Sequence, residues 1–211
     1  MTVKSPIFEE TTKNYLAQLA GIDFLSRAKS LGIGMADGEA LIPLLGKTYR
    51  VSLKGVFDPS GKEPTHAVSV VLCKYLLLCP DSTPRGEDWV SYKDFKDAGP
   101  FIGGFVNNTE KALVRYFSGR KDGLKLAGHN LGGHPPDLEL SYQAVLQFDV
   151  LPKIPLLLLF NDKDEEFPAQ CNLLFQKKAE RYLDMECLAI LGWFLTDTLI
   201  QTLEAEHKRI M

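Results

Sequence analysis

Apolar residues recur at helical spacing near both ends of the chain. Residues 7–20 and 22–31 place apolar side chains three and four positions apart, and Gly32 then offers the left-handed conformation that ends many helices. Residues 185–207 repeat this spacing over a longer stretch, directly after Asp184, which is suited to cap a helix. The pattern therefore predicts three helices in these ranges.

The predicted C-terminal helix carries two apolar stripes. Its main stripe, which is expected to face the core, consists of Leu188, Leu191, Leu195, Leu199 and Leu203. Ile190 and Phe194 form a second stripe on another side. This second stripe indicates either burial on two sides within the domain or contact with a second copy of the chain, which would make the protein a homo-oligomer.

The first half of the chain also contains a predicted hairpin and a predicted apolar helix. Residues 32–39 are expected to form a loop, and residues 40–57 form two apolar runs around Gly46, the second of them alternating, as in a hairpin. Residues 66–79 are apolar around most of a helical circumference, and Thr65 precedes them as a cap. Both elements are expected to contribute to the core.

Farther along, a capped helix and two strands are predicted. Residues 108–117 follow Asn108 or Thr109 as the cap and have Glu110 in the first turn, where its carboxylate complements the helix dipole. Residues 138–150 alternate between apolar and polar side chains, which predicts a strand with one buried face. Residues 154–160 are apolar on both faces, which is typical of a central strand.

Together these elements predict a single α+β domain with a mostly antiparallel sheet packed by helices. Residues 7–31 would form a helical N-terminal segment and residues 40–168 a mixed body. Residues 169–211 would form a helical C-terminal segment that includes the long helix. The chain of 211 residues contains no internal repeat or linker that would divide it.

Composition and charge exclude several classes of partner. The net charge of −3 leaves no overall basic field for a polyanion, so binding to nucleic acid is not expected. The longest apolar runs fall far short of the roughly 20 residues that span a bilayer. The N-terminal residues do not resemble a secretion signal, and the four cysteines lie in apolar patterns as reduced thiols would. We therefore expect a cytoplasmic protein without membrane contact.

The segment AGHNLGGHPPD contains His129 and His134 around a pair of glycines. Neutral imidazole is a common metal ligand, and the glycines would let the backbone fold tightly around an ion. However, this spacing matches no metal-binding motif, and the segment is rich in helix-breaking residues. The favoured interpretation is a glycine-rich connector, and no metal is predicted on this pattern alone.

The acidic run NDKDEEFP directly follows the predicted central strand. Asp162, Asp164, Glu165 and Glu166 form a candidate ligand or metal site, because crowded carboxylates repel each other unless a cation neutralises them. The run lacks the glycine and the closing glutamate of an EF-hand loop. The alternative is that the acids precede a helix beginning near Pro168, where negative charge is favourable.

A basic stretch lies between the predicted helix and the histidine segment. Its candidates for binding an anion are Lys111, Arg115, Arg120 and Lys121. Lys111 and Arg115 share a helix face at a spacing of four residues. The alternative is an ordinary solvated surface, which is the more common origin of such runs.

The C-terminal half resembles a known family. The stretch LPKIPLLLLFNDKDEEFPAQCNLLF, followed by LDMECLAILGWFL, is similar to an uncharacterised prokaryotic family, domain of unknown function 3786. The similarity extends more loosely back through LGGHPPDLELSYQAVLQF, the Gly103-Gly104 pair and DWVSYKDF, and more faintly through LLGKTYRVSL, so it covers most of the chain. The family brings no assigned activity or functional residues. Its occurrence in anaerobic bacteria and archaea implies a role in anaerobic metabolism.

Two functions remain open from the sequence. The first is a binding or accessory module whose sheet holds a small molecule or a cofactor-bearing partner protein near the glycine-rich segment and the acidic strand end. The second is a metal-dependent enzyme, such as a hydrolase, with His129 or His134 and the carboxylates of residues 162–166 as ligands. The sequence names no cofactor and no catalytic residue, so whether the protein is an enzyme stays open.

Overall fold

The protein is described by a computed structural model that covers residues 6–210. The helices are α1 (Pro6–Leu19), α2 (Phe24–Leu31), α3 (His66–Leu77), α4 (Ile102–Asn108), α5 (Glu110–Phe117), α6 (Lys121–Asn130) and α7 (Met185–Ile210). The strands are β1 (Gly34–Ala36), β2 (Glu39–Leu44), β3 (Lys47–Ser52), β4 (Gly55–Phe57), β5 (Trp89–Ser91), β6 (Ala144–Leu151), β7 (Ile154–Asn161) and β8 (Gln170–Gln176). Short 3-10 helices are η1 (Tyr92–Asp94), η2 (Gly99–Phe101) and η3 (Lys177–Arg181).

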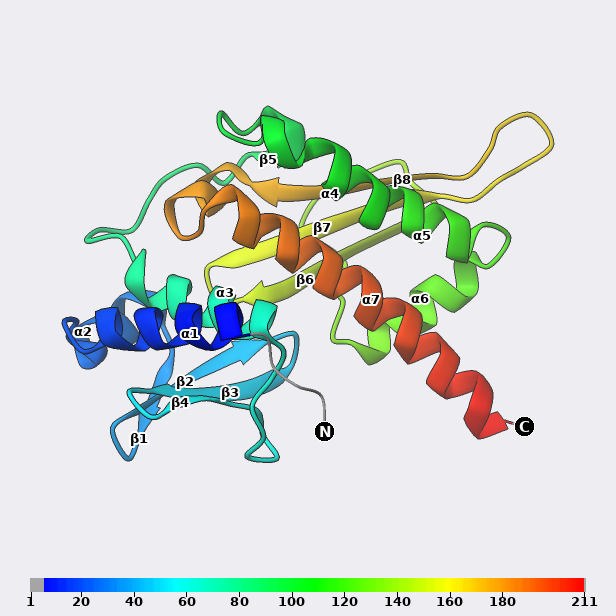
Figure 1. The fold of residues 1–211 in the computed structure, drawn as a ribbon. Coiled ribbons are helices and arrows are strands. Elements are labelled where there is room, and N and C mark those ends of the chain that lie inside the picture. Colours follow the sequence, from blue (N-terminus) through cyan, green and yellow to red (C-terminus); the bar gives the residue numbers. More distant parts are fainter. Residues whose placement is uncertain (1–5, 211) are drawn as a thin grey trace.

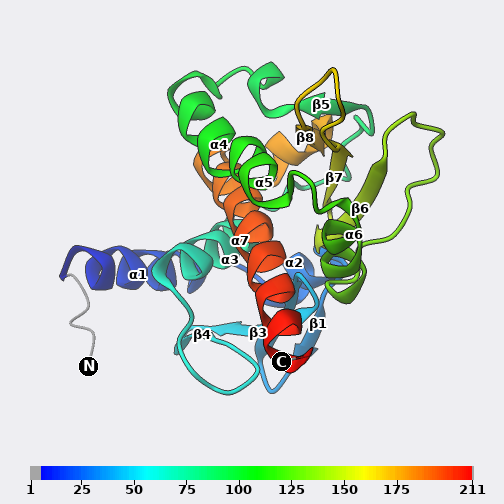
Figure 2. The same ribbon diagram turned by 90° about the vertical axis from the view of Figure 1, so that its right-hand side faces the viewer.

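The strands form two antiparallel sheets. The first sheet has the order β1-β2-β3-β4 and the second the order β5-β8-β7-β6. α7 crosses the second sheet diagonally, with α4 and α5 beside it (Figure 1). Figure 2 shows these three helices on the same side of that sheet. The predicted α+β fold, with a mostly antiparallel sheet and a long C-terminal helix, is confirmed.

In the first sheet the predicted hairpin is confirmed. β2 and β3 are joined by Leu45 and Gly46, which both have positive φ, at 45° and 74°. Positive φ at both central residues matches the twist of the flanking strands. The loop predicted over residues 32–39 is wrong in part, because β1 pairs with β2 across a similar turn at Asp37 and Gly38. A strand of three residues is too short for its alternation to stand out.

In the second sheet β7 is confirmed as an interior strand. The predicted strand over residues 138–150 is right only in its second half, since β6 begins at Ala144. The helix predicted near Pro168 is wrong, and so is the helical assignment from residue 169, because β8 occupies residues 170–176. β8 lies between β7 and β5, and its Cys171, Leu173 and Phe175 are buried at alternate positions. Pairing on both edges makes this segment a strand.

α7 begins and packs as its sequence predicts. Asp184 accepts a hydrogen bond from the N–H of Cys187 at 2.9 Å, which caps the first turn. All five leucines of the main stripe are buried. Gly32 ends α2 with a φ of 69°, and Thr65 caps α3, both as predicted. None of the helices within residues 6–210 is long and apolar enough to cross a membrane.

The helix predicted over residues 108–117 begins differently from expectation. Thr109 lies between α4 and α5, where the helix is interrupted. Its hydroxyl donates to the carbonyl of Phe105 at 2.7 Å instead of accepting a hydrogen bond from a backbone N–H of the next turn. Glu110 does lie in the first turn, where its carboxylate accepts the N–H of Leu173 at 3.2 Å. Burial raises the pKa of Glu110, and that hydrogen bond lowers it in part.

The two sheets are connected at one end of β6. The N–H of Leu45 donates to the carbonyl of Val150 at 3.1 Å, which extends the first sheet toward this edge strand. The N–H of Lys153, in the turn after β6, donates to the hydroxyl of Tyr75 on α3 at 3.1 Å. α3 therefore lies at the junction of the two sheets. The four cysteines are free and buried, as their apolar surroundings predict.

Candidate functional site

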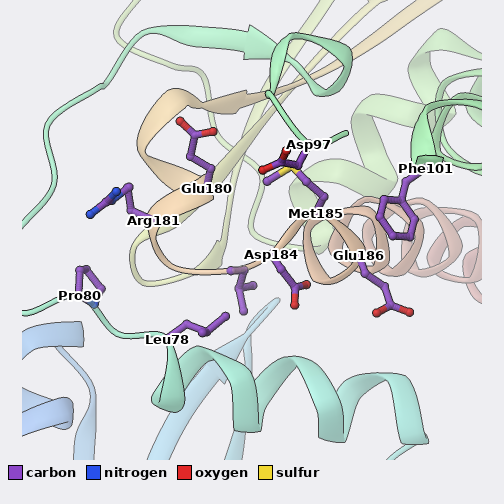
Figure 3. A pocket seen from close by; sticks show the side chains of 10 residues that line it. Leu78, Pro80, Asp97, Phe101, Glu180, Arg181, Asp184, Met185 and Glu186 are labelled. Carbon is purple, nitrogen blue, oxygen red and sulfur yellow. The ribbon is translucent and has the colours of Figure 1, made fainter. Parts of the chain in front are cut away.

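A cleft with a volume of about 740 Å³ opens at this junction. It lies between the end of α3 and the segment that leads from η3 into α7 (Figure 3). Its lining consists of Leu78, Pro80, Asp97, Phe101, Glu180, Arg181, Leu183, Asp184, Met185 and Glu186. Figure 3 shows Arg181 and Phe101 at opposite ends of this set.

A second cleft of about 580 Å³ adjoins the first. The two clefts share Leu78, Pro80 and Arg181. The second cleft is also lined by Arg27, Arg85 and residues of the segment from Leu77 to Pro84. We call the first the acidic half and the second the basic half of one cleft. Their volumes lie in the range of about 300–1,000 Å³ that is usual for ligand pockets.

The loop of residues 78–88 forms the common wall of both halves and is attached at two places. At its start the carbonyl of Cys79 accepts a hydrogen bond from Nη1 of Arg27 at 2.5 Å. At its end the carbonyl of Gly86 accepts from the N–H of Lys178 at 2.8 Å, and the carbonyl of Asp88 accepts from the N–H of Lys177. The loop is thereby held against both α2 and η3.

An ion pair connects α3 to Asp184, which lines the acidic half. Nζ of Lys74 on α3 lies 2.6 Å from Oδ2 of Asp184, whose other oxygen caps α7. Partial burial raises the pKa of Asp184. The hydrogen bonds from Lys74 and Cys187 lower this pKa by more than burial raises it, so the net pKa lies below the ordinary value. Burial lowers the pKa of Lys74, but Asp184 raises it well above the ordinary value. Both groups therefore stay charged at neutral pH.

Aromatic packing supports the wall behind Met185. The hydroxyl of Tyr92 donates to the carbonyl of Met185 at 2.7 Å, and the ring of Tyr92 stacks on Phe105 at 4.2 Å between centroids. Burial raises the pKa of Tyr92 to about 12, so the hydroxyl stays protonated and keeps donating. Tyr92, Phe95 and Phe105 are buried in the core, and Phe101 is partly buried and also lines the cleft.

The two halves differ in how their charges are neutralised. In the acidic half Asp184 is paired with Lys74, and Glu180 lies 3.3 Å from Lys177. In the basic half the partner of Arg27 is Asp81, at 3.7 Å. Within residues 6–210, neither Arg85 nor Arg181 forms an ion pair or a side-chain hydrogen bond. Among the described residues, these two guanidinium groups at the cleft therefore have no partner.

The histidine segment lies along β6, the edge strand of the second sheet. His129 is exposed in the last turn of α6. His134 exchanges backbone hydrogen bonds with Gln147 of β6, and its Nε2 lies 3.7 Å from Oδ2 of Asp149. The segment thus covers part of the free edge of the second sheet, which is consistent with a connector.

Close packing explains two of the three glycines of this segment, while Gly132 has a φ of 83° and no atom within 4 Å of an added Cβ. A Cβ added at Gly128 would lie 2.4 Å from Cδ1 of Leu146, and one added at Gly133 would lie 2.6 Å from Cε1 of Phe148. Both contacts are with the buried face of β6. Glycine is required here because the backbone itself packs on the core.

The acidic run forms the turn between β7 and β8. Asp162 accepts hydrogen bonds from the N–H groups of Gly119, Lys121 and Lys163, at 2.6, 3.2 and 2.8 Å. Slight burial raises the pKa of Asp162, but these three bonds lower it more, so the net pKa is below the ordinary value. Asp164 accepts from the N–H groups of Glu166 and Phe167, which closes the turn.

The basic stretch is engaged with its own surroundings. Lys111 donates to the side chain of Asn107, and Arg115 donates to the carbonyl of the same residue at 3.2 Å. The guanidinium of Arg120 lies 5.4 Å from the centre of the Tyr116 ring. The turn at residues 119–121 meets Asp162, so the structure joins the acidic and the basic candidates through backbone hydrogen bonds.

The structure does not gather the remaining candidates into a metal centre. Within the described part of the chain, no group of three or more His, Cys, Asp or Glu side chains is close enough to hold a metal ion. The metal-dependent enzyme therefore stays a prediction without a geometry that favours it. Ile190 and Phe194 are partly buried and pack against the core, so the second stripe of α7 is at least in part internal.

Sequence reasoning missed the residues that line the cleft. Arg27, Arg85 and Arg181 lie on α2, on the loop of residues 78–88 and on η3. Dozens of residues separate them along the chain, so no local pattern connects them. The one local signal is the sequence PDSTPR, whose two prolines restrict a polar loop that ends in an arginine.

Comparison with known proteins identifies a family but no function. No curated protein and no solved structure matches the chain. One family model, described as a domain of unknown function (DUF3786), matches residues 23–198. This range includes the whole cleft, both sheets and most of α7. The chain therefore belongs to the DUF3786 family.

Proposed function

We propose that this chain is a small-molecule-binding module of the cytoplasm whose ligand occupies the cleft at the junction of the two sheets. The observation that carries the proposal is that two adjoining clefts share one wall, formed by Leu78, Pro80 and Arg181. Ligand sites are usually concave and mostly apolar, with a few polar groups that fix orientation. A role in anaerobic metabolism, or in presenting the ligand to a partner protein, is part of this proposal.

The lining supports binding of a ligand with two chemically different ends. The acidic half exposes part of Leu78 and has Phe101, Leu183 and Met185 in its lining, which favours an apolar group. The basic half is richer in polar surface and carries the three arginines. The Lys74–Asp184 pair and the hydrogen bond from Tyr92 to Met185 hold the wall in place before any ligand arrives.

Chemical-shift mapping with indole, an uncharged aromatic probe, tests this function. We expect saturable shifts in backbone amides of residues 78–86 and 181–186. Leu78→Trp, which fills the shared wall, should abolish them. The matched control is Leu126→Trp, because Leu126 on α6 is exposed to a similar extent, 46% against 44% for Leu78. Shifts that do not saturate, or that survive in Leu78→Trp, would overturn the proposal.

A further inference from the structure

We infer that the basic half of the cleft binds a phosphate group, so that the ligand is a phosphorylated small molecule. This inference rests on the proposed function and adds the chemical class of the ligand. Its basis is the convergence of Arg27, Arg85 and Arg181 from three separate elements on one polar cleft. Guanidinium groups match the geometry of phosphate oxygens and remain charged at any physiological pH.

The attachments of the loop bring the three arginines together. Arg27 is held at the start of the loop through Nη1, which contacts the carbonyl of Cys79 and lies 3.7 Å from Asp81. Within the described residues its Nε and Nη2 make no hydrogen bond, so they are available to a ligand. The hydrogen bond between Lys178 and Gly86 holds the other end of the loop to η3, which places Arg85 near Arg181.

The charge of the basic half favours a dianion. Its lining has three arginines and one carboxylate, that of Asp81, which is fully exposed and so neutralises Arg27 weakly. Two positive charges thus remain in excess. A phosphate monoester carries about −1.5 to −2 charges at neutral pH, whereas a single carboxylate carries one. A phosphate therefore neutralises the site more completely.

Backbone and hydroxyl donors add to the arginines. Ser82 lines the basic half, and Ser82 and Thr83 both line a smaller adjoining hollow of about 150 Å³. Within the described residues, the N–H groups of Asp81, Ser82 and Thr83 donate no hydrogen bond. Pro80 and Pro84 restrict the backbone on both sides of these groups. The loop therefore presents donors of the kind that phosphate oxygens accept.

Titration with inorganic phosphate at constant ionic strength, followed by amide chemical shifts, tests the inference. We expect saturable shifts at residues 80–86 and 181, with an affinity for phosphate that exceeds those for acetate and chloride. Arg85→Gln and Arg181→Gln should each weaken phosphate binding about tenfold, which corresponds to about 1.4 kcal/mol. Both side chains are exposed and have no partner within residues 6–210, so the variants should keep the melting temperature of the parent.

Arg115→Gln is the matched control, since Arg115 is also exposed and belongs to the basic stretch on α5. It should bind phosphate as the parent does. Phosphate binding no tighter than chloride binding, or a loss in Arg115→Gln equal to that in Arg181→Gln, would overturn the inference. If indole still maps to the cleft in that case, the proposed function stands and only the phosphate assignment fails.

Discussion

Two regions are rich in charges of one sign: the acidic turn between β7 and β8, and the basic half of the cleft. They differ in whether these charges have hydrogen-bond partners within the protein. In the turn, Asp162 and Asp164 accept five hydrogen bonds from backbone N–H groups. In the cleft, Arg85 and Arg181 have no partner within the described residues. The turn uses its charge to hold the chain, whereas the cleft leaves its charge available.

This difference shows why density of charge along a sequence is a poor guide to a binding site. Acids in a turn lie beside free backbone N–H groups, so three of these five hydrogen bonds come from the turn itself, and only those of Gly119 and Lys121 come from a distant segment. Of the arginines that converge from distant elements, Arg27 has partners, whereas Arg85 and Arg181 have none within the described residues. An unpaired charge at a cleft therefore points to a ligand more strongly than a charged run does.

The largest expected effect concerns Asp184, the carboxylate of the cleft that is used structurally. Asp184→Ala should lower the free energy of unfolding by about 2 kcal/mol, because it removes both the helix cap and the partner of Lys74. Asp184→Asn keeps an acceptor for the cap and should lose about 1 kcal/mol. Urea unfolding measures both. Equal losses in the two variants would show that the cap contributes nothing.

A smaller effect is expected in the acidic turn. Asp162→Ala should lower the free energy of unfolding by about 1 kcal/mol, because three N–H groups lose a charged acceptor at a partly exposed site. Glu165→Gln is the matched control, and it should change stability by less than about 0.5 kcal/mol. Thermal melting with and without divalent cations checks both. A more stable variant that also loses a cation-induced shift of the parent would indicate a ligand site.

The smallest effect is the pH dependence of the same turn. The folded-state pKa of Asp162 lies below its ordinary value of 3.8, so its charge stabilises the fold above that pH. This contribution is lost as the pH falls through the folded-state pKa. The difference in stability between the parent and Asp162→Asn should therefore be constant from about pH 5 to 7 and shrink below about pH 4. A difference that grows on acidification would contradict the hydrogen-bond assignment.

Local signals in the sequence were sufficient for most elements. The leucine stripe and Asp184 predicted α7, Thr65 predicted the start of α3, and the doubly apolar run predicted β7. Each signal lies within one element, because periodicity and caps depend on neighbouring residues alone. The glycine-rich character of the segment around His129 and His134 is also a local signal, although the contacts of Gly128 and Gly133 with β6 involve residues farther along the chain.

Only the tertiary structure decided those elements, and the site, that depend on residues distant in the sequence. β1 and β8 become strands by pairing with neighbours, and in β8 this pairing overrides the helix start suggested by Pro168. The cleft exists because α2, the loop of residues 78–88 and η3 meet where the two sheets join. A sequence records composition and local order, but the spatial approach of Arg27, Arg85 and Arg181 follows from packing of the whole chain.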